Sequence, residues 1–383
     1  MGVPVVVLRY DKRDMGHVSK YVTEVHRIPF PDNDPQQVLQ TLRWMSARHP
    51  GALLMSASDP AIALLAQHQY KLAELGFTVA TSSEKAAMTF LDKTATYALA
   101  RAVGVDIPIT VTLDTEDDIA RYAEVAAFPA VLKPALSHRY QLAFGRKWTR
   151  VDNLDAAVRE FALARAAGIT VNLQEFIPGD ELCGANYNSY FCLGDAQVEF
   201  TARKIRNSPP ETGSPCAAVS QHIPEVIEPG RRLLAAADFR GFSCIEFKRD
   251  SRDGVYKLIE VNGRHNLSGM LALRCGINFP WIHYQHLMLG RLPHHVDFEK
   301  GVHWVDITRD MKTLRYYRQV PGYSAVRFAQ PYLSRHVFAV LSGRDPKPAI
   351  ARARDTLRVI TTGHRIGNFF PPQEAASPGT TTW

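Results

Sequence analysis

Residues 244–268 read CIEFKRDSRDGVYKLIEVNGRHNLS and contain two apolar, strand-like segments on either side of a Ser-Arg-Asp-Gly turn. A three- or five-residue loop centred on Asp253 places Glu246 opposite Glu260 on the paired strand. Because strand side chains alternate, Glu260 and Asn262 share one face. Two facing carboxylates repel unless a cation lies between them, and oxygen ligands without His or Cys suit Mg²⁺. The hairpin therefore predicts a magnesium-nucleotide site with Glu246, Glu260 and Asn262 as metal ligands.

The alternative for this hairpin is a solvated pair of strands whose outer face is acidic, because charged residues usually lie on the surface. The neighbouring positions Ile245, Phe247, Leu258 and Val261 are apolar. Such strands are expected to be largely buried, and a buried carboxylate is costly without a partner. The apolar neighbours therefore favour a cation site over a solvated face.

The segment Glu260-Val-Asn-Gly-Arg264 resembles the Glu-(hydrophobic)-Asn-Pro-Arg signature that closes the metal site of ATP-grasp ligases. Three further segments resemble the upstream landmarks of that superfamily and occur in the same order. They are Leu91-Asp92-Lys93 with the helix that leads to Pro108, Phe128-Pro-Ala-Val-Leu-Lys133-Pro, and Gln174-Glu-Phe-Ile-Pro-Gly-Asp-Glu181. The resemblance spans residues 91–264. It implies an α/β protein with an ATP-grasp fold, α+β in its nucleotide domain, and an N-terminal parallel α/β domain.

Two lysines are candidate contacts for the phosphates of a nucleotide. Lys133 ends an apolar run and precedes Pro134, so its ammonium projects from a strand end as a point charge. The alternative is an ordinary surface lysine. The resemblance implies the same contact for Lys93. It also implies that Glu175, Phe176, Ile177 and Glu181 form the hinge that holds adenine and ribose, whereas without the resemblance this segment is a simple polar turn.

The loop that covers the phosphates in the superfamily is usually rich in glycine, but residues 135–148 contain only Gly145. Backbone groups cradle phosphate most easily where several glycines are present. We therefore expect side chains to replace part of this function, with Ser137, His138 and Lys147 as candidates.

A basic element at residues 203–206 precedes a Pro-rich loop. Arg203 and Lys204 are candidates for clamping a transferred phosphoryl group or an anionic substrate. An ordinary basic surface loop is the alternative.

The resemblance implies the chemistry of an ATP-dependent carboxylate-amine ligase that uses ATP and Mg²⁺, with Mn²⁺ as the alternative metal. A carboxylate attacks the γ-phosphate, and an amine then displaces phosphate from the acyl phosphate. Arg264 would hold the transferred group, and His265, Asn266 and Ser268 would line the acceptor pocket. Residues 248–264 and 276–280 resemble D-aspartate ligase-like and related amino-acid or peptide ligases most. A bicarbonate-activating carboxylase and a noncatalytic nucleotide-binding module are the two alternatives.

The first ninety residues alternate strand-like and helix-like segments, which predicts a small parallel α/β domain. Ligands gather beyond the carboxyl ends of strands in such sheets. Arg9, Ser19, Lys20 and Asp59 follow predicted strands, and we select Arg9 and Ser19 as substrate contacts. Polar loop residues without a ligand are the alternative.

We expect four segments in the chain: an N-terminal domain at 1–90, the nucleotide-binding and catalytic domain at 91–295, a C-terminal extension at 296–370, and a disordered tail at 371–383. Length alone suggests two or three domains for 383 residues, and 46% hydrophobic residues suffice for a substantial core.

The composition agrees with a cytoplasmic enzyme, and the resemblance implies small-molecule carboxylate and amine substrates. A homodimer is a further expectation. The net charge of +7 is spread along the chain, so nucleic acid is not an expected partner. No apolar run is long enough for a membrane span, and the run from Val3 to Leu8 is too short for a signal peptide. Five cysteines without a Cys-x-x-Cys pair favour reduced thiols.

Overall fold

The computed structural model describes residues 2–211, 213–293 and 296–362, and its contacts divide the chain into two compact units. Unit 1 comprises Met1–Leu54, His68–Val79 and Phe338–Trp383, and unit 2 comprises Met55–Gln67 and Ala80–Val337. The contacts thus divide the chain at other positions than residues 90 and 295. A division by contacts does not test a division by function, so the predicted domain boundaries stay a prediction. The tail predicted at 371–383 lies outside the described residues.

Unit 1 contains two separate pairs of parallel strands, each a two-stranded sheet. The pairs are β1 (Val5–Arg9) with β2 (Val22–Arg27), and β3 (Leu53–Leu54) with β4 (Thr78–Val79). The helical elements of unit 1 are η1 (Gly16–Val18), α1 (Pro35–Arg48), α3 (Gln69–Glu74) and α15 (Lys347–Thr362). Helix α1 begins at Pro35 because the Asp34 carboxylate accepts a hydrogen bond from the Gln37 amide. The parallel α/β character of this region is as predicted.

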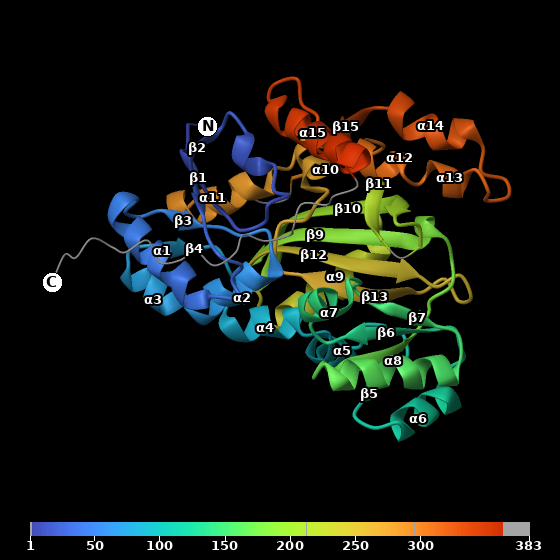
Figure 1. Cartoon of the computed structure of the whole chain (residues 1–383). Helices are drawn as coiled ribbons and strands as arrows, with labels where there is room; N and C mark the ends of the chain where they lie inside the picture. The colour runs from blue at the N-terminus through green and yellow to red at the C-terminus, as the bar shows by residue number, and fades with distance from the viewer. Residues whose placement is uncertain (1, 212, 294–295, 363–383) are drawn as a thin grey trace. The chain divides into compact units, whose positions relative to one another are not determined.

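Unit 2 is built on a seven-stranded sheet in the order β13-β12-β9-β10-β11-β14-β15. Its strands are β9 (Gly184–Cys192), β10 (Asp195–Ser208), β11 (Ser214–Ser220), β12 (Gly241–Arg249), β13 (Tyr256–Asn262), β14 (His303–Val305) and β15 (His336–Phe338). The pairings from β13 through β14 are antiparallel. Figure 1 shows β9, β10 and β12 side by side at the centre of this sheet. The predicted hairpin at residues 244–262 forms one edge of it.

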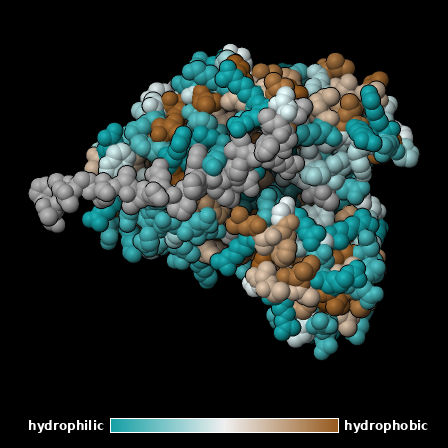
Figure 2. All heavy atoms as spheres, in the orientation of Figure 1, coloured by the Kyte–Doolittle hydropathy of each residue, from teal (hydrophilic) through white to brown (hydrophobic). Residues whose placement is uncertain are grey.

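A second sheet of unit 2 has four antiparallel strands in the order β5-β8-β6-β7. The strands are β5 (Thr110–Leu113), β6 (Ala130–Pro134), β7 (Thr149–Val151) and β8 (Val171–Glu175). Helix α8 (Leu154–Ala166) covers this sheet (Figure 1), and Phe161 and Ala164 pack against its core. In Figure 2 hydrophobic side chains are visible on the surface of this region, where Val125 and Leu163 are exposed. Two antiparallel sheets joined by helices confirm the α+β arrangement.

The remaining helices of unit 2 connect and cover these strands. They are α2 (Asp59–Gln67), α4 (Glu84–Leu91), α5 (Lys93–Ala102), α6 (Asp117–Val125), α7 (Ser137–Phe144), η2 (Glu181–Cys183), η3 (Pro224–Val226), α9 (Ile227–Ala236), α10 (Gly269–Arg274), α11 (Phe279–Leu289), α12 (Ile307–Met311), α13 (Leu314–Tyr317) and α14 (Ala325–Leu333). Within the described residues, no helix is both long and apolar enough to cross a bilayer.

The segment after residue 296 is tied into unit 2 by a buried ion pair between β10 and α12. Arg206 donates to both carboxylate oxygens of Asp310 at 2.7 and 2.8 Å, and neither side chain is exposed. Tyr323 and Tyr332 complete the pair, because Arg206 donates to Tyr323 Oη at 3.0 Å and Tyr332 Oη donates to Asp310 at 2.7 Å. The part of the predicted C-terminal extension before Phe338 thus belongs to unit 2.

Candidate functional site

The β12–β13 hairpin places Glu246 directly opposite Glu260, as the sequence predicted. The loop between the strands has six residues, 250–255, and not three or five. A bulge in β13 nevertheless brings Glu246 opposite Glu260. Phe247 pairs with Leu258, so Ile259 is the extra residue between the two pairs. The Ile259 carbonyl instead accepts a hydrogen bond from Tyr97 Oη at 2.8 Å.

Each of the two facing carboxylates forms an ion pair with a lysine from another element. Lys93, the first residue of α5, lies 3.0 Å from Glu260, and Lys204 of β10 lies 2.5 Å from Glu246. Although burial alone would raise the pKa of Glu260, the Lys93 ammonium lowers it well below its ordinary value. Both lysines were predicted to contact the ligand. The structure brings them together with the predicted metal ligands.

Asn262 lies two residues after Glu260 and is 8% exposed. Alternation along β13 puts the two side chains on the same face. Within residues 2–211, 213–293 and 296–362, no group of three His, Cys, Asp or Glu side chains is arranged to hold a metal. Two carboxylates and one amide fit a metal whose remaining ligands come from phosphate or water, which is the usual arrangement for Mg²⁺.

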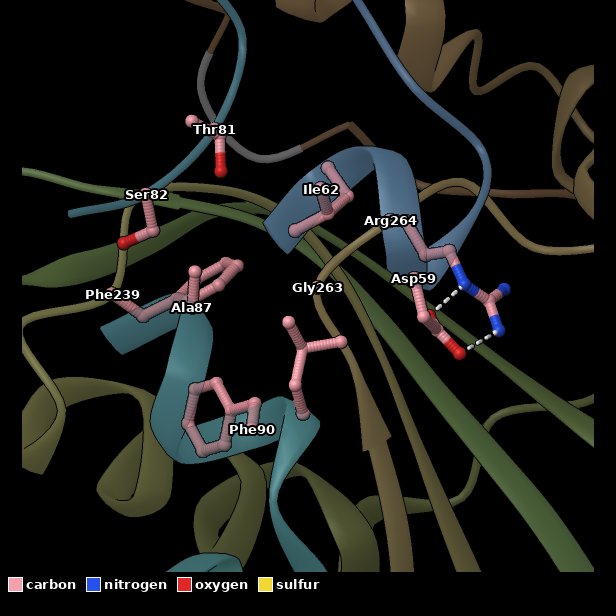
Figure 3. Close-up of a pocket in the computed structure, with 10 residues that line it drawn as sticks. Asp59, Ile62, Thr81, Ser82, Ala87, Phe90, Phe239, Gly263 and Arg264 are labelled. Atoms are coloured by element: carbon pink, nitrogen blue, oxygen red, sulfur yellow. Dashed lines mark hydrogen bonds and ion pairs between the residues drawn. The ribbon is translucent and has the colours of Figure 1, made fainter. Parts of the chain in front are cut away.

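Arg264 follows the hairpin and forms a two-point ion pair with Asp59, the first residue of α2 (Figure 3). Its Nε and Nη2 atoms donate to the two carboxylate oxygens, with 3.3 Å between Nη2 and Oδ2. The carboxylate raises the pKa of Arg264 although burial acts in the opposite direction. Asp59 and Arg264 line a pocket together with Ile62, Thr81 and Gly263.

Lys133 on β6 is 9% exposed and has no ion-pair partner among the described residues. A buried ammonium without a counter-ion is unfavourable, so this position fits an anionic ligand. Lys147 is exposed, and its charge is among those that lower the pKa of Glu260. Ser137 begins α7, but its side chain lies outside the described set, as does that of His138.

The predicted adenine hinge begins at Glu175, the last residue of β8, and its residues contact both sheets of unit 2. The Phe176 ring has Arg150 of β7 at 5.1 Å and Lys248 of β12 at 5.2 Å from its centroid. Ile177 is buried. Phe176 is thus in cation–π contact with one strand of each sheet.

The two acidic hinge candidates already have partners within the protein. Glu175 is buried beside Arg252 and Lys257 of the β12–β13 hairpin. Glu181 accepts hydrogen bonds from Tyr317 Oη at 2.7 Å and from the Glu211 amide at 3.1 Å. Their contact with ribose stays a prediction.

Arg203 and Lys204 are adjacent in β10, so their side chains point to opposite faces of the sheet. Arg203 donates to Gln221 Oε1 at 2.7 Å, to the Leu182 carbonyl at 2.6 Å and to Tyr256 Oη at 3.2 Å. These contacts give Arg203 a clear structural function. Its direct part in catalysis stays a prediction.

The predicted acceptor residues lie after Arg264 in unit 2. His265 stacks on Phe242, with ring centroids 4.5 Å apart, and burial lowers the pKa of His265 to about 4. Asn266 donates to Asn188 Oδ1 at 2.6 Å, and Ser268 precedes α10. His265 also lines a pocket with Thr81, Arg240 and His283.

Arg9 and Ser19, the other predicted substrate contacts, belong to unit 1. Arg9 lies 3.1 Å from His17 Nε2 and donates to the Lys12 carbonyl at 2.6 Å. Ser19 donates to Asp345 Oδ2 at 2.5 Å. Both side chains thus have partners inside unit 1, and their contact with substrate stays a prediction.

Two residues near the site were not among the candidates, namely Asn188 as the partner of Asn266 and Lys248 beside Phe176. Asp59 was named as a candidate substrate contact, but not as the partner of Arg264. Burial lowers the pKa of Lys248. Lys248 had a detectable signal, because it lies on the same strand and the same face as Glu246. Asn188 is in a strand that we did not predict.

The two sheets, the hairpin and the order of the lysines define an ATP-grasp fold. No family model matches the sequence. The sequence is 25% identical over 279 residues to the D-aspartate ligase of Enterococcus faecium strain Aus0004, an alignment that covers 67% of this chain and 64% of the relative. The chain thus spans less than two thirds of the length of that curated relative.

Two solved structures share the fold with little sequence identity. The biotin carboxylase domain of the Hydrogenobacter thermophilus 2-oxoglutarate carboxylase, a complex with MgADP and bicarbonate, has a TM-score of 0.61 and 14% identity, covering 79% of this chain and 68% of that one. The L-amino acid ligase from Bacillus licheniformis has a TM-score of 0.54 and 18% identity, covering 70% and 63%. The predicted fold is therefore confirmed.

Proposed function

We propose that this protein is an ATP-dependent ligase that activates a carboxylate as an acyl phosphate and joins it to an amine, releasing ADP and phosphate. The observation that carries the proposal is the pairing of Glu246 with Glu260 across the hairpin, each beside a lysine. The sequence similarity to a D-aspartate ligase supports an amino acid as one substrate.

The residues present fit ATP and a divalent metal ion. Glu246, Glu260 and Asn262 would hold Mg²⁺, whose charge would neutralise that of the terminal phosphates. Lys133 has no acidic partner among the described residues and would contact the phosphates. Phe176 and Ile177 would hold the base. Mn²⁺, a homodimer and a cytoplasmic location stay predictions.

Arg264 and the lysines supply the positive charge that such a reaction needs. Phosphoryl transfer from ATP is accelerated chiefly by positioning and by stabilising charge on the transferred group. Lys93 of α5 and Lys204 of β10 pair with the carboxylates of the hairpin, and Arg264 follows β13 and pairs with Asp59. We assign Arg264 to the transferred phosphoryl group, and His265, Asn266 and Ser268 to the acceptor.

The test is a search for substrates by release of inorganic phosphate from ATP with pools of amino acids and carboxylic acids. An acyl phosphate route yields ADP and phosphate, and hydroxylamine added with the correct carboxylate yields a hydroxamate without an amine. Formation of AMP and pyrophosphate would contradict the proposal, because the carboxylate would then have attacked the α-phosphate.

A second candidate is an enzyme that activates bicarbonate, which the likeness to the biotin carboxylase domain favours. In that case ADP formation depends on bicarbonate and not on an added carboxylic acid. Measuring phosphate release in bicarbonate-depleted buffer separates the two. A noncatalytic nucleotide-binding module is disfavoured, because Glu246, Glu260, Asn262 and Arg264 are all present.

A further inference from the structure

The Asp59 carboxylate occupies one of the edges of Arg264 that can bind an oxyanion at two points. Both donors on this edge, Nε and Nη2, are directed to Asp59. A guanidinium binds a carboxylate and a phosphoryl group with the same two-point geometry. An oxyanion that binds at this edge therefore competes with the Asp59 carboxylate.

Helix α2, which carries Asp59, has packing contacts besides the bond to Arg264. Helix α2, which begins at Asp59, is anchored by Ile62 and Ala66, which pack against Ala87 of α4. The two charged side chains remain accessible to a ligand, since Asp59 is 30% and Arg264 is 22% exposed. Figure 3 shows both at the pocket that α2 helps to line.

Asp59 is not a proposed metal ligand, in contrast to the two carboxylates of the hairpin. Glu246 and Glu260 are paired with lysines and face each other across the hairpin. Asp59 forms its ion pair with Arg264, and its charge also acts on Lys93, whose pKa it helps to raise. Its negative charge therefore weakens the binding of any anion at Arg264.

We propose that Asp59 is a built-in competitor which an oxyanion displaces from Arg264, so that Asp59 sets the affinity of the site for that oxyanion. This inference rests on the proposed function for the role of Arg264. The oxyanion is either the γ-phosphoryl group of the nucleotide or the carboxylate of the substrate, and the two sources are separable by experiment.

The test is Asp59→Asn, which removes the charge and keeps both the volume and a side chain suited to the start of a helix. Removing a charge a few ångströms from a partly exposed site changes affinity roughly tenfold. Calorimetric titrations with MgADP and with the magnesium complex of a nonhydrolysable ATP analogue compare the variant with the parent protein. Asp59→Ser is the second variant, and thermal unfolding verifies that each is folded.

If the γ-phosphoryl group displaces Asp59, the variant binds the ATP analogue about tenfold more tightly and MgADP equally well. If the substrate carboxylate displaces it, both nucleotides bind as before and the KM for the carboxylate falls about tenfold. The inference is overturned if the variant binds both nucleotides no more tightly than the parent protein and its KM for the carboxylate does not fall. That result is expected of a purely structural contact, because its loss weakens binding or leaves it unchanged.

The matched control is Glu199→Gln, which removes the two-point Arg231–Glu199 pair (2.9 Å between Nε and Oε1) outside the site. Its titrations should equal those of the parent protein. Binding of MgADP by the parent protein tests the proposed function separately. Should the parent bind no nucleotide, titration with inorganic phosphate still decides the inference, because tighter phosphate binding by Asp59→Asn supports it and unchanged binding refutes it.

Discussion

Replacing Asp310 with Asn should destabilise unit 2 strongly, because it leaves a buried guanidinium without its counter-ion. Arg206 and Asp310 are both fully buried and share two hydrogen bonds. Removing one partner of a buried ion pair costs about 3–5 kcal/mol of the free energy of unfolding. Tyr323 still accepts one hydrogen bond from Arg206, and Asn keeps one acceptor oxygen, so the lower end of that range applies.

Urea unfolding at 25 °C measures this loss, followed by the fluorescence of the fully buried Trp304 on β14. We expect a lower midpoint at an unchanged dependence on urea. The control is Glu160→Gln, which breaks the partly exposed Arg146–Glu160 pair of 2.6 Å and should cost at most about 1 kcal/mol. A loss below about 1 kcal/mol for Asp310→Asn would refute the reasoning.

A double replacement separates the cost of an unpaired charge from the value of the pair itself. Arg206→Met combined with Asp310→Leu removes both charges and keeps most of the volume. Buried ion pairs can often be replaced by apolar side chains of similar size with little loss. The double variant should therefore be more stable than Asp310→Asn alone. If it is less stable, packing and not the unpaired charge dominates at this position.

Three further predictions concern the site and its pH dependence. Glu260→Gln should abolish ATP turnover, because it removes the charge but not the volume of a proposed Mg²⁺ ligand, and full activity would remove the metal-site hypothesis. The midpoint of urea unfolding should also fall, because Lys93 loses its counter-ion, so turnover is measured under conditions in which the variant is verified to be folded. Lys133→Ala should weaken ATP binding at least tenfold by calorimetry, and unchanged affinity would show that Lys133 does not contact phosphate. Burial lowers the pKa of His283 to about 3 from 6.5. Between pH 6.5 and about 3 this histidine is therefore protonated in the unfolded chain and neutral in the folded protein. The free energy of unfolding falls as the pH decreases through this interval, by about 1.4 kcal/mol per pH unit from this group. His283→Gln should reduce this slope in urea unfolding between pH 6 and 5, and an identical slope would contradict the assignment.

The local arrangement of the hairpin was predictable because side chains in paired strands follow a period of two. The facing position of Glu246 and Glu260 was inferred with a loop of odd length, whereas the loop has six residues. A one-residue shift in register would have moved Glu260 to the other face. The bulge at Ile259 compensates for the difference. The local sequence does not indicate this bulge, and one contact of the bulged residue comes from a distant segment, because Tyr97 of α5 donates to the Ile259 carbonyl.

The contacts between distant segments were not predictable from spacing. Arg264 and Asp59 are separated by 205 positions, and no periodicity relates them. Strand β14 was expected in a separate extension, but it pairs with β11 inside the large sheet. Its three residues, His303–Val305, are buried, so their backbone groups must pair with a neighbouring strand. The sequence does not identify that strand. Long-range pairing of this kind is determined by the fold as a whole.

Three cations of the site are each paired with a carboxylate, and this follows from the cost of burial. An isolated ammonium or carboxylate in a protein interior is strongly unfavourable, whereas a hydrogen-bonded pair is tolerated. Lys93, Lys204 and Arg264 therefore each lie beside a carboxylate of the same site. A ligand that introduces only negative charge would leave those carboxylates unpaired. ATP together with a divalent cation introduces both negative and positive charge. The phosphates can pair with the cationic side chains, and the metal ion can pair with the carboxylates that those side chains leave.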